Sequence, residues 1–204
     1  MRCLNRYPTF ANGTWNWFKD FLSYDNARLS QALLLGYRHL GDPSYLEVGM
    51  ASLDFLLNTQ YNKGYFDMIG NEGWYHKGKE KALYSQQPVD AGAMTETCIL
   101  AMELTGDQKY LEMAYAAFQW YLGRNLQGKS LFNPLIGSCS DGLDPDGPNE
   151  NRGAESTISY VLAQCALYRW ELIGSINDSV LSAPKLYDGG AKIQLEKALE
   201  SAHR

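Results

Sequence analysis

Residues 25–57 read DNARLSQALLLGYRHLGDPSYLEVGMASLDFLL, and residues 90–122 read DAGAMTETCILAMELTGDQKYLEMAYAAFQWYL. At a constant offset of 65 residues, both stretches begin with Asp and carry Gly-Asp followed two residues later by Tyr-Leu-Glu. Most other pairs are like for like, such as Phe55 with Trp120. Self-similarity at a fixed period is typical of repeat architectures, so these stretches predict a helical repeat.

Each copy of the repeat is interpreted as two helices joined by a tight turn. Gly41 and Gly106 follow the last apolar residue of a helical pattern, where a left-handed glycine ends a helix, and Asp42 and Asp107 then take the N-cap position of the next helix. In the second copy, the helix from about residue 90 to 104 is apolar on nearly all sides, which predicts an inner helix. The helix that starts near Tyr110 has one apolar face, which predicts an outer helix.

A third inner helix is predicted over residues 153–173, and Leu195–Ala198 would belong to its outer partner. Its apolar stripe is formed by Ala154, Ile158, Val161, Cys165 and Leu172. We therefore predict an all-α protein with about six helices in three hairpins, and a single domain over residues 1–204, a length that suits one ordinary domain. In these helices Cys98, Cys165 and Trp120 are interpreted as packing residues.

Composition excludes several classes of partner. The net charge is −5 with no basic run, so no source of affinity for nucleic acid is visible. The uncharged apolar stretches are far shorter than the roughly 20 residues of a membrane span, and the first residues do not resemble an export signal. Four separated cysteines without CxxC spacing and three histidines suggest neither a disulfide framework nor a zinc site. We expect a cytoplasmic protein that needs no cofactor or metal.

Candidate chemistry lies where two long segments, residues 61–89 and 125–152, lead from an outer helix to the next inner one. Both segments leave the hairpins at the same end, and the inner helices begin there with Asp25, Asp90 and Glu155. Helix capping explains any one of these acids. Three carboxylates around one mouth also suit glycosidic bond cleavage, in which one carboxyl donates a proton and another activates water or attacks carbon.

Aromatic residues near the same mouth indicate a sugar substrate, because a flat apolar ring with a polar edge matches a pyranose, although packing explains each ring singly. They are Trp15, Trp17, Tyr24, Trp74, Tyr75 and Tyr84. His76 has no visible partner for base catalysis and is predicted to contact sugar. The acidic segment 137–153 raises a calcium alternative, but it lacks EF-hand spacing and its Asp-Gly pairs are turn formers.

Six ordered motifs between residues 15 and 172 carry a resemblance to a known superfamily. They are Trp15-Asn-Trp-Phe, Tyr24-Asp-Asn-Ala-Arg-Leu, Gly70-Asn-Glu-Gly-Trp-Tyr, Gln86-Gln-Pro-Val-Asp-Ala, Cys139-Ser-Asp-Gly-Leu and Asn151-Arg-Gly-Ala-Glu-Ser-Thr. Together they resemble an (α/α) toroid of the six-hairpin glycosidase-like superfamily, in the version found beside group 1 glycosyltransferases in bacteria and archaea.

The resemblance implies that catalytic acids and sugar-binding aromatics lie at the mouth formed by the inner-helix N-termini. It favours Asp25, Asp90 and Glu155 as catalytic residues. The hydrogen-bonding neighbours that it implies are Asn26, Arg28, Gln86, Gln87, Asn151 and Arg152. A full toroid has six hairpins and this chain supplies about three, so the chain is the C-terminal part of a larger toroid, or pairs with another chain as in a homodimer, or leaves its mouth open.

Three functions fit this sequence. The leading interpretation is a carbohydrate-active domain that cleaves a glycosidic bond of an oligosaccharide or glycoconjugate by carboxylate acid/base chemistry. The alternative is a non-catalytic glycan-binding or accessory domain of a glycosyltransferase system. A helical-repeat scaffold for protein partners is the third, and it would show an exposed apolar groove in place of an acidic aromatic mouth.

Overall fold

The computed structural model describes residues 7–176, with side chains described as far as Glu171, and it confirms the predicted all-α class. The helices are α2 (Ala27–Leu40), α3 (Pro43–Gln60), α4 (Pro88–Thr105), α5 (Gln108–Gln119) with the 3-10 turn η1 (Trp120–Leu122), and α6 (Ala154–Ile176). Residues 7–10 form one further helical turn. The expected outer partner of α6 at Leu195–Ala198 lies outside the described residues.

The two hairpin turns have the chemistry that the repeat predicts. Gly41 and Gly106 adopt φ of 71° and 73°, and their N–H groups bond to the carbonyls of Tyr37 and Met102. Asp42 then accepts a hydrogen bond from the N–H of Ser44, and Asp107 accepts one from the N–H of Lys109. The left-handed glycine and the capping aspartate reverse the chain within two residues in both hairpins, which confirms the prediction.

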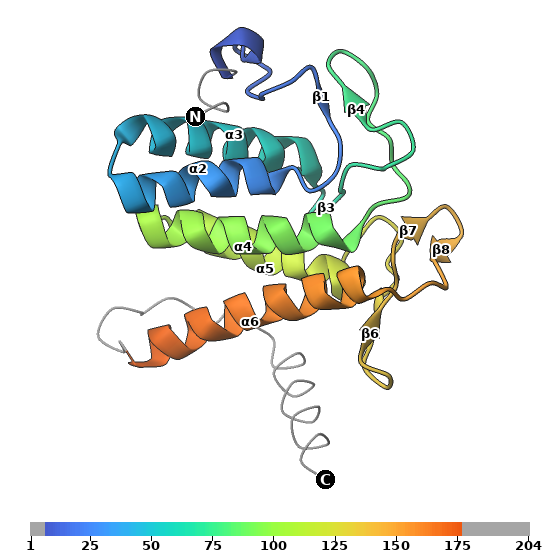
Figure 1. Cartoon of the computed structure of the whole chain (residues 1–204). Coiled ribbons are helices and arrows are strands. Elements are labelled where there is room, and N and C mark those ends of the chain that lie inside the picture. Colours follow the sequence, from blue (N-terminus) through green and yellow to red (C-terminus); the bar gives the residue numbers. More distant parts are fainter. Residues whose placement is uncertain (1–6, 177–204) are drawn as a thin grey trace.

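Helix α4 is the centre of the structure. It lies between α2 and α6, with α5 against it, and its residues are buried from Pro88 to Met102 apart from Val89 and Glu96 (Figure 1). Helix α5 buries only Tyr110, Ala114, Ala117 and Phe118, so it is an outer helix as predicted. The approach of α6 to α4 is close, because a Cβ added to Gly92 would lie 2.3 Å from Ser159 Oγ.

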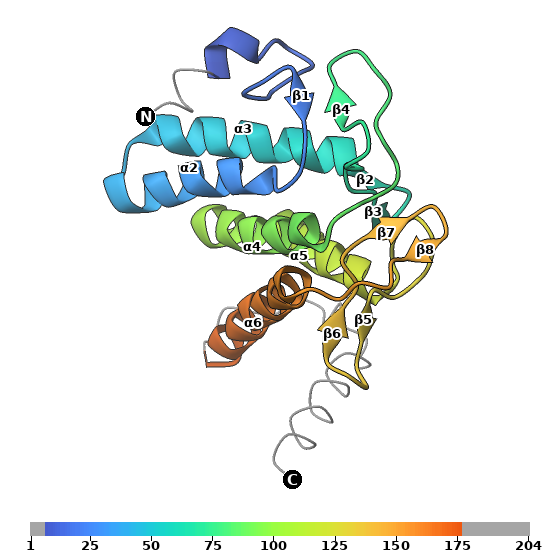
Figure 2. The ribbon, with the colours of Figure 1, turned by 45° about the vertical axis from the view of Figure 1, so that its right-hand side comes forward.

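The long segments between hairpins fold into four small antiparallel ribbons, and each ribbon pairs two strands of two residues. The pairs are β1 (Phe21–Leu22) with β4 (Tyr75–His76), β2 (Tyr61–Asn62) with β3 (Tyr65–Phe66), β5 (Phe132–Asn133) with β6 (Ser138–Cys139), and β7 (Leu143–Asp144) with β8 (Gly147–Pro148). The ribbons gather at the end where α2, α4 and α6 begin, as Figure 2 shows. The segments therefore shape one end of the stack of inner helices.

Burial on α6 differs from the expectation. Its buried residues include Ser159, Tyr160, Ala163 and Leu167, whereas the predicted stripe that contains Cys165 faces solvent. Cys98 and Trp120 are buried as predicted, but the packing role expected for Cys165 is wrong. The periodicity of α6 was correct, but no element among the described residues covers that side of the helix.

Candidate functional site

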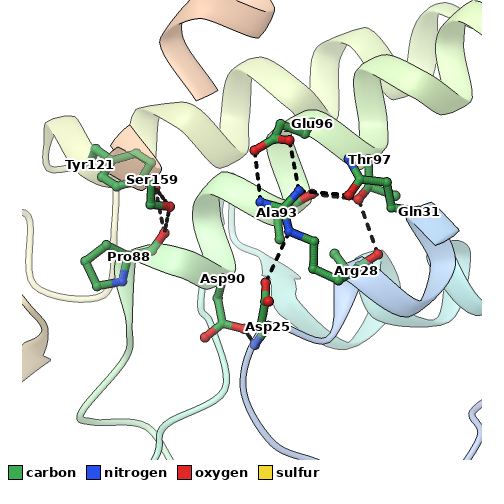
Figure 3. A network of polar contacts seen from close by, with 11 residues as sticks. Asp25, Arg28, Gln31, Pro88, Asp90, Ala93, Glu96, Thr97, Tyr121 and Ser159 are labelled. Atoms are coloured by element: carbon green, nitrogen blue, oxygen red, sulfur yellow. Dashed lines mark hydrogen bonds and ion pairs between the residues drawn. The ribbon is translucent and has the colours of Figure 1, made fainter. Parts of the chain in front are cut away.

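The structure brings the first two predicted carboxylates into contact. The backbone N–H of Asp25, just before α2, donates a 2.8 Å hydrogen bond to Oδ1 of Asp90 in the first turn of α4 (Figure 3). The two residues occupy equivalent positions of the repeat, 65 residues apart. The start of one inner helix is thus tied to the start of the next by a carboxylate.

Asp25 has a strained backbone. Its φ is 52°, in the left-handed region that non-glycine residues avoid at a cost of about 1–2 kcal/mol. Its carbonyl accepts the hydrogen bond from Arg28 N–H that opens α2, so the strain lies at the point where the loop becomes a helix. The bond from Asp25 N–H to Asp90 stabilises this conformation. Strain of this kind at a carboxylate is a reason to consider a functional role.

The electrostatics of the pair favour protonation. Burial raises the pKa of Asp90 well above its usual value, and the backbone hydrogen bonds from Asp25 and Asn26 oppose that rise. Asp90 Oδ2 is buried and makes no hydrogen bond. The pKa of Asp25 is also raised, first by burial; Arg28 lowers it, and the negative charges of Glu96 and Glu155 raise it. A carboxyl held neutral in this way can act as a proton donor.

Arg28 links Asp25 to Glu96 on α4. Its guanidinium makes two hydrogen bonds to Glu96 on α4, at 2.9 and 3.0 Å, and a third to Gln31. Arg28 Nε lies 3.5 Å from Oδ1 of Asp25. A bidentate arginine–carboxylate pair fixes the orientation of both side chains, so Glu96 sets the position of the cation beside Asp25.

Glu155 extends the acidic mouth from α6. It is exposed in the first turn of that helix, and its charge contributes to the raised pKa of Asp25. The start of α6 is held by Asp141, whose Oδ1 accepts hydrogen bonds from Gly153 N–H at 2.6 Å and Ser156 Oγ at 2.7 Å. A cavity of about 350 Å³ lies beside it, lined by Gln87, Pro88, Val89, Asp141, Gly153, Ala154, Glu155 and Ser156.

Four residues predicted to bind substrate are buried. One is Trp15, which is 4% exposed and donates its indole N–H to the carbonyl of Lys19. The other three have packing or hydrogen-bond partners in place of a substrate. Trp17 is 1% exposed and packs against Phe18. The amide of buried Asn26 bonds to both the N–H and the carbonyl of Ser23. The side chain of fully buried Gln86 also has its hydrogen bonds satisfied within the protein. Its amide NH₂ donates to Asp67 Oδ1 and Leu83 O, and its amide oxygen accepts from Met68 N–H and Trp120 Nε1. These contacts give all three residues structural roles.

The predicted aromatics other than Trp17 lie around a different cavity or on the β1–β4 ribbon. Trp15 and Tyr75 line a cavity of about 670 Å³ whose lining includes none of the three carboxylates. Trp74 stacks on Phe21 and donates its indole N–H to Asn71, and His76 is exposed against the same Phe21 ring. None of the contacts described for residues 7–171 joins these rings to the three carboxylates. Tyr24, whose ring is exposed, directly precedes Asp25.

The remaining predicted residues are accessible. Asn151 and Arg152 are exposed beside the start of α6, and Gln87 is half-buried at the N-cap position of α4. Sequence reasoning missed Glu96 and Asp141. Glu96 could have been found as the one acid that follows Asp90 in the apolar first three turns of α4, whereas nothing in the turn-rich segment around Asp141 distinguishes that aspartate from its neighbours. No group of three or more His, Cys, Asp and Glu side chains in the described part of the chain could hold a metal ion.

No protein-family model matches the chain, and no curated protein matches it. Several solved structures do. A glycoside hydrolase family 76 mannosidase from Bacteroides thetaiotaomicron aligns with 16% identity and a TM-score of 0.57, over 88% of this chain and 44% of that chain. An inactive variant of the family 76 α-1,6-mannanase of Salegentibacter sp., in complex with α-1,6-mannotriose, aligns with 18% identity and a TM-score of 0.57, over 86% and 51%. A family 76 glycoside hydrolase from a bovine B. thetaiotaomicron strain aligns with 22% identity and a TM-score of 0.55, over 74% of this chain and 32% of that chain.

Over the aligned part, the chain shares the (α/α) hairpin fold of these family 76 structures, which confirms the predicted fold class. The resemblance to the glycosyltransferase-associated version stays a prediction. The chain spans about half the length of the first two structures described above. Among residues 7–176, no helix is long and apolar enough to span a membrane.

Proposed function

We propose that this chain is a carbohydrate-active domain that cleaves a glycosidic bond by carboxylate acid/base chemistry. The observation that carries the proposal is the Asp25–Asp90 contact at the start of adjacent inner helices, with Asp25 strained and Glu155 close enough to influence its pKa. The fold supports a sugar substrate, because the similar structures are glycoside hydrolases and mannanases.

We propose different roles for the three carboxyls, according to their exposure. Asp90 is buried, so its role is to hold Asp25 in position. Asp25 is partly exposed with a raised pKa, and its carboxyl donates a proton to the glycosidic oxygen as the bond to the anomeric carbon breaks. Glu155 is exposed, and its carboxylate takes a proton from the water that adds to the anomeric carbon.

Accessible side chains around the mouth would hold the sugar. We propose Arg28, Gln87, Asn151 and Arg152 for hydrogen bonds, and Tyr24 for a ring face. The contacts predicted for Trp15, Trp74, Tyr75 and His76 stay predictions for a more distant part of an oligosaccharide, because these residues lie apart from the carboxylates in all described contacts.

A second function, the non-catalytic glycan-binding or accessory domain of a glycosyltransferase system, is favoured by one observation. Arg28 lies 3.5 Å from Asp25, and a neighbouring cation neutralises a carboxylate that a catalyst would keep reactive. The mannanase variant described as inactive carries asparagines in place of two consecutive aspartates. The present sequence has no two consecutive aspartates, and Asp25 is followed by Asn26.

Two further proposals concern the setting of the protein. We propose a cytoplasmic location, which the free thiols of Cys98 and Cys139 support, since neither is in a disulfide. We also propose that the partner of this chain is a second copy or the missing half of a toroid, because the chain spans about half of the similar structures.

The test is a panel of oligosaccharides that includes α-1,6-linked mannose oligomers, scored for product release and for thermal shift. Asp25→Asn is the informative variant, because asparagine tolerates a positive φ and the change removes only the ionisable group. Glu150→Gln, an exposed acid in the preceding loop, is the matched control. Product that is lost in Asp25→Asn and Glu155→Gln but kept in the control supports catalysis. A thermal shift without product supports the accessory domain, and silence in both assays refutes the carbohydrate proposal.

A further inference from the structure

An apolar stripe runs along the outer side of α6, away from the residues that contact α4. Ile158, Val161, Leu162 and Tyr168 are 44–55% exposed, and Cys165 is exposed between them. Their spacing of three and four residues places them on one face of the helix. Single exposed apolar residues are ordinary on a surface, but a continuous face of a helix marks an interaction site.

The other end of the stack also has an uncovered helix face. On α2, Ala32 is exposed, Leu35 is 38% exposed and Leu40 is 68% exposed. In the second repeat, the equivalents of Ala32 and Leu35 are Thr97 and Leu100, which are buried. The Thr97 hydroxyl lies 3.3 Å from the carbonyl oxygen of Ala27 on α2, and it also donates to the carbonyl of Ala93 in its own helix at 2.6 Å. On α4, this face is covered by the preceding inner helix, α2. On α2, the equivalent face is exposed.

The repeat makes the two open faces complementary. Among the helices of residues 7–176, α4 packs against its predecessor α2 with one side and its successor α6 with the other, and it is the only inner helix with both neighbours (Figure 2). Among the described elements, α2 lacks a predecessor, and α6 lacks both a successor and an outer partner. The end of one such stack therefore fits the beginning of another, as in repeat proteins with uncapped ends.

We propose that a second copy of this chain covers both faces, with α6 of each copy packed against α2 of the other. The two copies would be related by a two-fold axis parallel to the inner helices, so that the two contacts close a ring. The length of the chain supports this closure, since it spans about half of the similar toroids. All inner helices start at the same end (Figure 1), so both sets of carboxylates would open at the same mouth. This last consequence rests on the proposed function, whereas the assembly does not.

Sedimentation velocity on the full chain tests the proposal without any glycan. We expect wild-type protein at twice the chain mass of 22.9 kDa. Val161→Glu on α6 and Leu35→Glu on α2 should each give monomer. Leu135→Glu is the control, because Leu135 is 92% exposed in the turn between β5 and β6 and belongs to neither proposed contact face, so this variant should stay dimeric.

Mixing the two variants distinguishes ring closure from other dimers. Val161→Glu and Leu35→Glu together retain one unmodified α6–α2 contact, so the mixture should recover dimer that neither variant forms alone. A contact of α6 with α6 would recover none. A monomeric wild type, a dimer insensitive to both variants, or a mixture without dimer would each refute the proposal.

Cys165 supplies an independent readout on a Cys3→Ser background. Cys98 and Cys139 are buried, so maleimide labelling should report on Cys165. Labelling should slow at least tenfold between dilute monomer and concentrated dimer. Protection that does not change with concentration would mean that the chain covers its own α6 face, and this would also overturn the proposal. Failure of either assay leaves the oligosaccharide tests of function unaffected.

Discussion

Replacement of Asp90 by asparagine should make the protein more stable at neutral pH. The pKa of Asp90 is raised well above its usual value by burial, so the folded protein holds this proton more tightly than the unfolded chain does. Unfolding therefore releases a proton once the pH exceeds the pKa of the unfolded chain, about 3.9. In wild type, the free energy of unfolding falls as pH rises from there to the raised pKa. Asparagine has no proton to lose, so this decrease is absent in the variant.

The size of the effect follows from proton linkage. One titrating group changes the free energy of unfolding by about 1.36 kcal/mol for each pH unit between its two pKa values. For a chain of 204 residues, 1 kcal/mol shifts Tm by roughly 2–4 °C. Tm of Asp90→Asn should therefore gain roughly 3–5 °C on wild type for each pH unit above about 4, until the folded pKa is reached.

The assay is thermal unfolding followed by circular dichroism at intervals from pH 4 to 8. Asp90→Ala serves as the comparison, because it also removes the charge but leaves Asp25 N–H without its 2.8 Å acceptor. An unsatisfied buried N–H costs about 1–3 kcal/mol, so Asp90→Ala should lie below Asp90→Asn at every pH. Parallel pH profiles for wild type and Asp90→Asn would refute the raised pKa. Equal stability of the two variants would refute the role of the hydrogen bond.

Three further tests compare the thermal stability of other variants. Asp25→Gly should be more stable than Asp25→Ala by about 1 kcal/mol, because only glycine adopts φ of 52° without strain, and the reverse order would contradict the left-handed backbone. Arg28→Gln should cost about 1 kcal/mol, since the Glu96 pair is partly exposed, and should raise the pKa of Asp25, measured by NMR titration; an unchanged pKa would argue against the influence of Arg28. Gly92→Ala should cost about 1–3 kcal/mol, because its Cβ would lie 2.3 Å from Ser159 Oγ, and Ser159→Ala should reduce that cost; a cost unchanged in the double variant would exclude this clash.

The parts that the sequence predicts well are those decided within a few residues. The helix-ending glycines and capping aspartates at residues 41–42 and 106–107 use only local backbone geometry, so their pattern is sufficient. The contact of Asp25 with Asp90 was also within reach, because two equivalent positions in adjacent repeats must lie side by side. Local signals, combined with the repeat, therefore locate the mouth.

The parts that the sequence does not predict depend on distant partners. Gln86 occurs in a polar loop segment and resembles a ligand contact, but its amide is enclosed by Asp67 and by Trp120, which are 19 and 34 residues away. Asn26 is equally misleading, because its amide is satisfied by the backbone of Ser23. A polar residue near a mouth is a candidate for binding only if its hydrogen bonds are free, and the sequence does not show which bonds are already made.

Helix α6 shows that hydrophobic periodicity alone does not identify the partner of a helix face. Its apolar period predicts that a face is buried, and the interpretation that this face points to the core was wrong, because α6 contacts α4 through Ser159 and its neighbours instead. Periodicity states that a helix face favours burial, but it does not state against which partner. In an isolated chain, an apolar helix face exposed to solvent would be unfavourable. In a repeat whose two end faces correspond to its internal contacts, the exposed stripe is the expected edge of an assembly, and the free energy to be gained by covering it scales with its apolar area.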